Sequence, residues 1–164
     1  MFDNVYTIGE EKPEFQADYQ SQILEHWQQI QCDKRYPSKE DFRPQQFPKH
    51  LPKIAIVSVE DAESFSGRLT GETVSEVLRL EPGREKLVAA ADENISLVVR
   101  AMLARASENE RPTYFKGKFR PELYSAIGFS ALVLPFSYED QGDQMDALLL
   151  AFDFDEQLPI GIIE

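Results

Sequence analysis

A run of prolines between an amphipathic segment and a β-branched segment constrains the fold of this chain more than any other feature. The prolines lie at Pro37, Pro44, Pro48 and Pro52. Each proline fixes φ, removes a backbone donor and disfavours helix in the residue before it. A helix that precedes them therefore cannot continue past Tyr36, and the segment up to the first strand is predicted to be an irregular connector.

The segment before the connector has the spacing of one helical face. Apolar side chains recur at intervals of three or four residues: Phe15, Tyr19, Ile23, Trp27 and Ile30. This spacing predicts an amphipathic helix over residues 15–31, with residues 1–14 as an N-terminal tail. We expect Trp27 to anchor the helix in the core, because a buried indole contributes a large apolar area.

The rest of the chain alternates between strand and helix patterns. Strands are predicted at 53–59, 64–70, 112–119, 124–137 and 144–154. A short helix is predicted at 73–80, and a longer helix is predicted from about Glu85 or Asp92 to Ser107. This order predicts an α+β fold, a five-stranded antiparallel sheet with helices on one face and an extra N-terminal helix. A sheet whose face is covered by helices in this way often encloses an apolar cavity. One domain is expected over 15–155, followed by a C-terminal tail at 156–164.

The charge balance argues against nucleic acid and membrane partners. Acidic residues outnumber basic ones by 29 to 17, which gives a net charge of -12, and the basic residues form no patch. A phosphate backbone or an anionic lipid surface would be repelled over most faces. The sequence also lacks a long apolar run and a secretion signal, and its lone cysteine, Cys32, suits a reducing compartment. A cytoplasmic protein without membrane insertion is expected.

No pattern in the sequence points to catalysis or to a metal site. His26 and Cys32 are interpreted as an incidental surface pair rather than a base and a nucleophile. Residues 128–132 lack the second glycine of a nucleophile elbow and are interpreted as part of a strand. Asp153 and Asp155 are either paired carboxylates or solvated charges at a strand end. We therefore predict no catalytic residue and no metal ligand.

The order of several short motifs resembles PAS domains, and more narrowly the stand-alone PAS domains common in alphaproteobacteria. The motifs are a tryptophan on an N-terminal helix, a Pro-x-x-x-Asp connector, a Leu-Pro entry to the first strand, and an Arg-Leu-x-Gly end to the second. In this sequence they are Trp27, Pro37 with Asp41 and Pro44, Leu51 with Pro52, and Arg68 with Gly71. The resemblance implies a PAS fold used for ligand sensing or protein docking in bacterial signalling, including motility and cell-cycle regulators of histidine-kinase pathways.

The resemblance does not extend to the usual PAS cofactors. A photoreceptor-type flavin site needs a cysteine on a central helix, whereas Cys32 lies before the first strand. A haem site usually needs a histidine on the long helix or its neighbour, and residues 72–111 contain none. No cofactor is predicted, although an unidentified small ligand is possible. Candidate pocket residues are Arg68, Phe115 and Phe129. Arg68 is interpreted either as an anion ligand or, preferably, as the partner of Asp41.

Two functions stay open at this point. The first is a non-enzymatic regulator that binds signalling proteins such as histidine kinases or their scaffolds. For this regulator, a second apolar stripe on the N-terminal helix predicts a homodimer. The apolar C-terminal tail either packs back onto the domain or is a docking peptide. The second function is a sensor that holds a small molecule in its apolar cavity.

Overall fold

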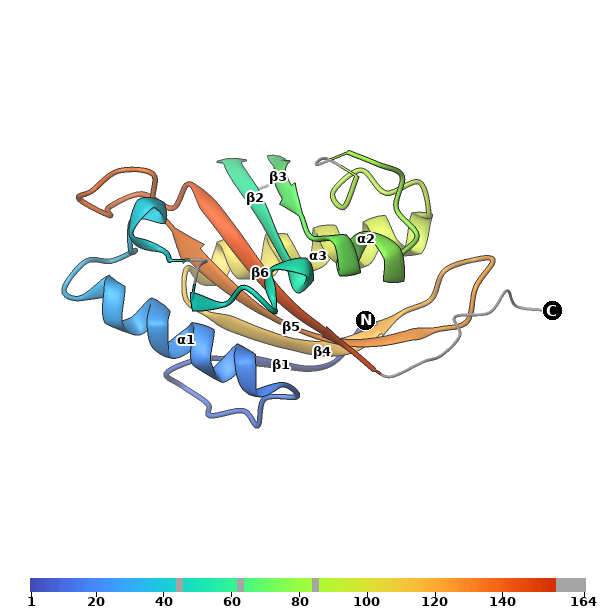
Figure 1. The fold of residues 1–164 in the computed structure, drawn as a ribbon, viewed down its shortest axis with the longest axis horizontal. Coiled ribbons are helices and arrows are strands. Elements are labelled where there is room, and N and C mark those ends of the chain that lie inside the picture. Colours follow the sequence, from blue (N-terminus) through green and yellow to red (C-terminus); the bar gives the residue numbers. More distant parts are fainter. Residues whose placement is uncertain (44–45, 62–63, 84–85, 156–164) are drawn as a thin grey trace.

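The computed structural model describes residues 1–43, 46–61, 64–83 and 86–155. Within them, six antiparallel strands form one sheet in the order β1-β4-β5-β6-β2-β3, shown in Figure 1. The strands are β1 (Phe2–Thr7), β2 (Ile54–Asp61), β3 (Ser64–Thr70), β4 (Thr113–Phe119), β5 (Ile127–Phe136) and β6 (Ala147–Phe154). The helices are α1 (Asp18–Gln31), α2 (Glu72–Val77) and α3 (Glu93–Asn109), with short 3-10 helices η1 (Lys39–Asp41) and η3 (Leu51–Lys53). The predicted α+β architecture is confirmed.

The sheet has one strand more than the sequence predicts, because β1 adds to its edge beside β4. Val5 lies opposite Phe115 and Tyr6 lies opposite Tyr114. The prediction of a tail over residues 1–14 was therefore wrong for this segment. A register shift between Phe2 and Asn4 interrupts the pairing. The two-residue alternation that identifies a strand is consequently too short to be recognised in the sequence.

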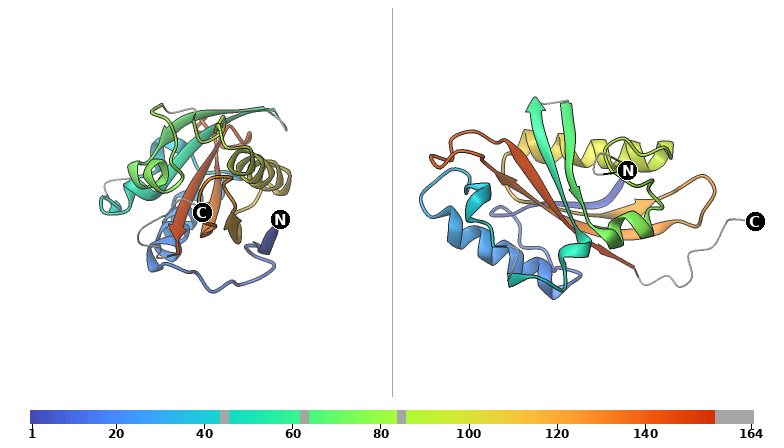
Figure 2. Two further views of the ribbon diagram at one scale, coloured as in Figure 1. Left: turned by 90° about the vertical axis from the view of Figure 1, so that its right-hand side faces the viewer. Right: turned by 45° about the horizontal axis from the view of Figure 1, so that its top comes forward.

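Helices cover both faces of the sheet (Figure 2). One core cluster lies between the sheet and α2 with α3, and a second cluster lies between the sheet and α1 with the connector. The sequence predicts helices on one face of the sheet. α2 and α3 lie on one face as predicted, whereas α1 packs on the opposite face. Burial on both sides explains why β5 is buried at every position, since such strands have near-continuous apolar sequences.

Capping determines where the two long helices begin. α3 begins after Asp92, whose carboxylate accepts a hydrogen bond from the Ile95 N–H at 3.1 Å. α1 begins at Asp18 rather than at the predicted residue 15, because Ala17 is extended. Phe15 thus precedes the helix and packs edge-on against the Tyr114 ring, 4.8 Å between centroids.

The junction between β3 and α2 requires glycine at position 71. A Cβ on Gly71 would lie 2.2 Å from the Pro52 carbonyl oxygen and 2.8 Å from the Ile54 carbonyl oxygen. The Gly71 N–H also donates to the Ile54 carbonyl at 2.9 Å. The Leu51-Pro52 motif and the glycine that ends the Arg-Leu-x-Gly motif are therefore two sides of one backbone contact.

We predict that Gly71→Ala lowers the free energy of unfolding by about 2–3 kcal/mol, because neither carbonyl can move away cheaply. Urea denaturation measures this loss. Gly117→Ala is the matched control, since a Cβ there would meet its nearest atom at 3.5 Å, an ordinary contact. Equal losses in the two variants would contradict the assignment of the strain to the Pro52 contact.

Candidate functional site

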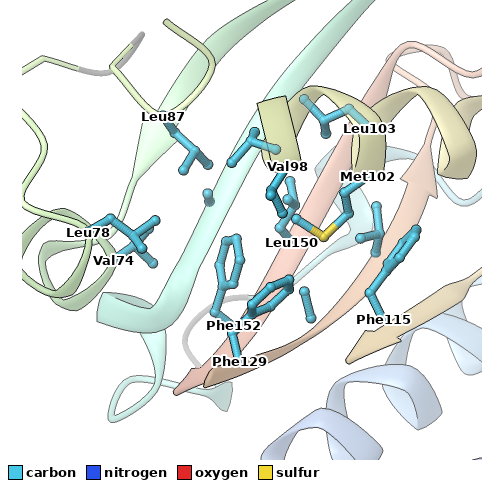
Figure 3. Packing of buried hydrophobic residues seen from close by; sticks show 14 of the residues in the cluster. Val74, Leu78, Leu87, Val98, Met102, Leu103, Phe115, Phe129, Leu150 and Phe152 are labelled. Atoms are coloured by element: carbon cyan, nitrogen blue, oxygen red, sulfur yellow. The ribbon is translucent and has the colours of Figure 1, made fainter. Parts of the chain in front are cut away.

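The space between the sheet and the helices α2 and α3, where the sequence predicts a cavity, is filled by side chains (Figure 3). Met102, Phe115, Leu150 and Phe152 have no exposed surface, and Phe129 is 2% exposed. The Phe129 ring centroid lies 4.4 Å from that of Phe119 and 6.3 Å from that of Phe152. A void large enough for a water molecule would appear as accessible surface on these side chains. The described residues leave no such void around Phe115 or Phe129.

Arg68 lies on the opposite face of the sheet from Phe115 and Phe129. It is exposed, and its Nε donates to the Ser58 Oγ at 2.6 Å. The predicted pairing of Arg68 with Asp41 was wrong, because the Asp41 carboxylate instead lies 3.7 Å from the Lys34 Nζ. The structure therefore does not bring the three candidate pocket residues together.

The tryptophan motif and the connector motif supply hydrogen-bond partners for backbone groups at the end of β5. The Trp27 Nε1 donates to the Pro135 carbonyl at 2.8 Å, and the Ser137 N–H donates to the Pro37 carbonyl at 2.9 Å. The pairing of β4 with β5 extends only to Val133, so these contacts satisfy backbone groups that have lost that strand partner. The prediction of Trp27 as a core anchor is confirmed. Pro44 lies outside the described residues, as does the C-terminal tail.

A buried polar network that no pattern in the sequence predicted joins α1 to the sheet. Gln20 has no exposed surface, and its Nε2 donates to the Ala151 carbonyl at 3.0 Å and to the Ser130 Oγ at 3.1 Å. Its Oε1 accepts from the Tyr114 hydroxyl at 3.2 Å. The Tyr19 hydroxyl donates to a carbonyl of β6, and burial raises its pKa well above the usual range. A buried network satisfied in this way fixes the position of α1 on the sheet.

Asp153, one of the two carboxylates considered for acid-base chemistry, has structural partners. The Asp153 carboxylate lies 3.2 Å from the Lys53 Nζ and accepts from the Gln16 side chain at 2.8 Å. Asp155 follows β6, and its N–H donates to the Gly128 carbonyl at 2.9 Å. In the part of the chain that the structure describes, no group of three or more His, Cys, Asp or Glu side chains is placed to hold a metal ion.

His26 is a buried residue of the contact between α1 and the connector. Its Nε2 accepts from the Arg43 N–H at 3.2 Å, and its ring packs against Phe42 and Phe47. Burial, and to a smaller extent the charge of Arg43, lower the pKa of His26. Cys32 is exposed at the end of α1, and its Sγ contacts the backbone of that helix instead. The interpretation of His26 as a surface residue was therefore wrong. Its burial could not be predicted, because a histidine beside an apolar helical stripe fits an exposed position equally well.

The exposed face of α1 is polar. Its exposed residues are Asp18, Ser21, Gln22, Glu25, Gln28 and Gln29. The apolar residues Tyr19, Ile23 and Trp27 are all buried against the sheet. The second apolar stripe from which the sequence analysis predicts a homodimer is therefore absent from α1.

The comparison with known families agrees with this architecture of an antiparallel sheet and flanking helices. A family model described as a PAS domain matches residues 16–150. Because the match covers most of the chain, the protein belongs to the PAS domain family. PAS domains are in general sensory modules rather than catalysts. No curated protein and no solved structure matches the chain. None of the helices in the described residues has the length and apolarity needed to cross a membrane.

We predict that Phe129→Ala lowers the free energy of unfolding by about 3–5 kcal/mol, because it opens a cavity in a filled core. Denaturant titration of the two proteins measures the difference. Leu123→Ala, at a side chain that is 65% exposed, is the control and should change stability by less than about 0.5 kcal/mol. A small effect of Phe129→Ala would instead indicate that this ring borders an open pocket.

We predict that acid destabilises the protein in part through His26. Its pKa is lower in the folded state than in the unfolded state, so the unfolded state binds more protons and stability falls as the pH drops below about 6.5. Urea denaturation at pH 7.5 and pH 5.5 measures this loss, which should be smaller in His26→Phe. The same loss in the variant and in the wild type would contradict a role for His26. His50→Phe tests the second histidine with a lowered pKa separately.

Proposed function

We propose that this PAS domain is a non-enzymatic cytoplasmic regulator that acts through contacts with other proteins. The proposed setting is bacterial histidine-kinase signalling of the alphaproteobacterial type, in motility or cell-cycle control. The proposed partners are histidine kinases or their scaffolds. The observation that carries the proposal is the filled core around Phe115 and Phe129. A domain that holds no ligand in its core must exchange its signal through its surface.

The shape of the surface supports the same proposal. A groove of about 890 Å³ lies between the end of β2, the end of α3 and the turn that follows β5. Its lining includes the apolar side chains of Val59 and Met145. The groove is open and the rest of its lining is mostly polar and acidic, so it suits contact with a polypeptide better than enclosure of an apolar small molecule. A homodimer would have to use a surface other than α1, whose exposed face is polar.

We predict that affinity capture from the cytosol of the source organism recovers a specific set of signalling proteins, histidine kinases or their scaffolds among them. Quantitative mass spectrometry measures the recovery. The control bait combines Gly71→Ala with Phe129→Ala, which keeps the charge. Together the two predicted losses approach the whole stability of an ordinary domain, so a specific partner should be depleted with it. Recovery of nothing but the bait itself, from well-folded wild-type protein, would contradict the proposal and favour a small-molecule sensor.

A further inference from the structure

The outer edge of β3 is available to another chain segment. β3 ends the strand order and pairs only with β2, so its other edge has no strand partner among the described residues. Proteins commonly protect such edges with proline, with charged side chains, with bulges or with a covering element. Ser64–Thr70 contains neither proline nor lysine, and the extra residue of its bulge and its only charge are both Arg68. Residues 64–67 precede this bulge, so an extended segment of another protein can add along them as a further strand.

A bulge directs the Arg68 side chain to the face of the sheet opposite α2 and α3. Leu69 lies opposite Ile56 and Gly67 lies opposite Val57, so Arg68 is the additional residue between them. Bulges of this kind change the direction of a side chain. The Arg68 Nε donates to the Ser58 Oγ at 2.6 Å, and the Tyr138 hydroxyl hydrogen-bonds the same oxygen. Since Ser58 is only 5% exposed, this contact holds the guanidinium in a defined orientation.

The two Nη groups of Arg68 have no hydrogen-bond or ion-pair partner among the described residues, although the protein as a whole is strongly acidic. A guanidinium with both Nη groups available matches the two oxygens of a carboxylate. The Arg68 guanidinium can therefore accept an acidic group of a partner.

Apolar surface surrounds the guanidinium. Leu69 and Tyr138 are each 44% exposed and are among the few large apolar side chains that reach the surface of the described residues. Ile56 is half-buried and lies opposite Leu69 on the neighbouring strand. A partner that covers this area gains apolar burial around a charged contact, which is the usual arrangement of a strong interface anchor.

We propose that the outer side of β3 binds an extended acidic segment of a partner protein. The segment pairs with the outer edge of β3 over residues 64–67, a carboxylate accepts hydrogen bonds from the Arg68 Nη groups, and apolar side chains cover Leu69 and Tyr138. This proposal rests on the proposed regulatory function and names the surface and the chemistry of its partner. A second copy fits less well, because Ser64–Thr70 contains no carboxylate to pair with Arg68.

NMR titration of the whole chain with two end-blocked peptides tests the proposal. One peptide is Thr-Val-Glu-Val-Thr-Val, and in the other glutamine replaces the glutamate. The glutamate peptide should shift the amide signals of residues 64–70 and the Arg68 Nε–H signal, and it should bind at least about tenfold more tightly than the glutamine peptide. Arg68→Gln should abolish this difference. Arg100→Gln, which removes an exposed arginine from α3, should preserve it.

Three results would overturn the proposal: equal affinity for the two peptides, shifts away from β3, or no shifts. Concentration-dependent shifts at residues 64–70 without peptide would also overturn it, because they would identify a second copy as the occupant. Each of these results leaves the affinity capture of signalling proteins unaffected. Conversely, discrimination between the peptides without capture of signalling proteins would confirm the surface while rejecting the proposed pathway.

Discussion

The structure depends on the burial of β5 and β6 from both sides. Every residue of β5 is buried, as are the first six residues of β6, because α3 packs on one face and α1 on the other. Apolar burial of this extent is the dominant favourable term in folding. The space on both sides of these central strands is therefore occupied by side chains that pack against one another.

The helices on the two faces of the sheet are held by different kinds of contact. α3 contributes an apolar face, whereas α1 is joined to the sheet by apolar side chains together with the buried amide of Gln20 and the hydroxyl of Tyr19. A polar group buried with all its partners gives a defined position, because any displacement leaves donors and acceptors unpaired. These buried polar contacts therefore define the position of α1 on the sheet more narrowly than an apolar stripe alone would. The exposed face of α1 is polar. The large apolar side chains that are exposed in the described residues therefore lie outside α1, Leu69 and Tyr138 among them.

The sequence predicted the helices and strands that have a long run of regularly spaced apolar residues, or whose ends are marked by residues such as proline and glycine. The bounds of β3 agree at both ends, and α3 lies within two residues of the later predicted start at Asp92 and the predicted end at Ser107. β1 was missed because its pairing is short and irregular. The site was predicted less well, since the face on which Arg68 lies depends on a bulge that shifts the register, and a shift of one residue reverses the direction of a side chain. The close packing of the core likewise could not be predicted from the sequence, because it depends on how aromatic rings from different strands contact one another.

The core around Phe115 and Phe129 is filled by side chains, and the proposed regulator therefore signals through surface contacts. This claim is tested by mass spectrometry of the small molecules released on denaturing the protein, purified from its own cytosol. We expect no compound in a stoichiometric amount relative to the chain. A compound released at one equivalent, and retained by the native protein through gel filtration, would contradict the claim and identify the protein as a small-molecule sensor.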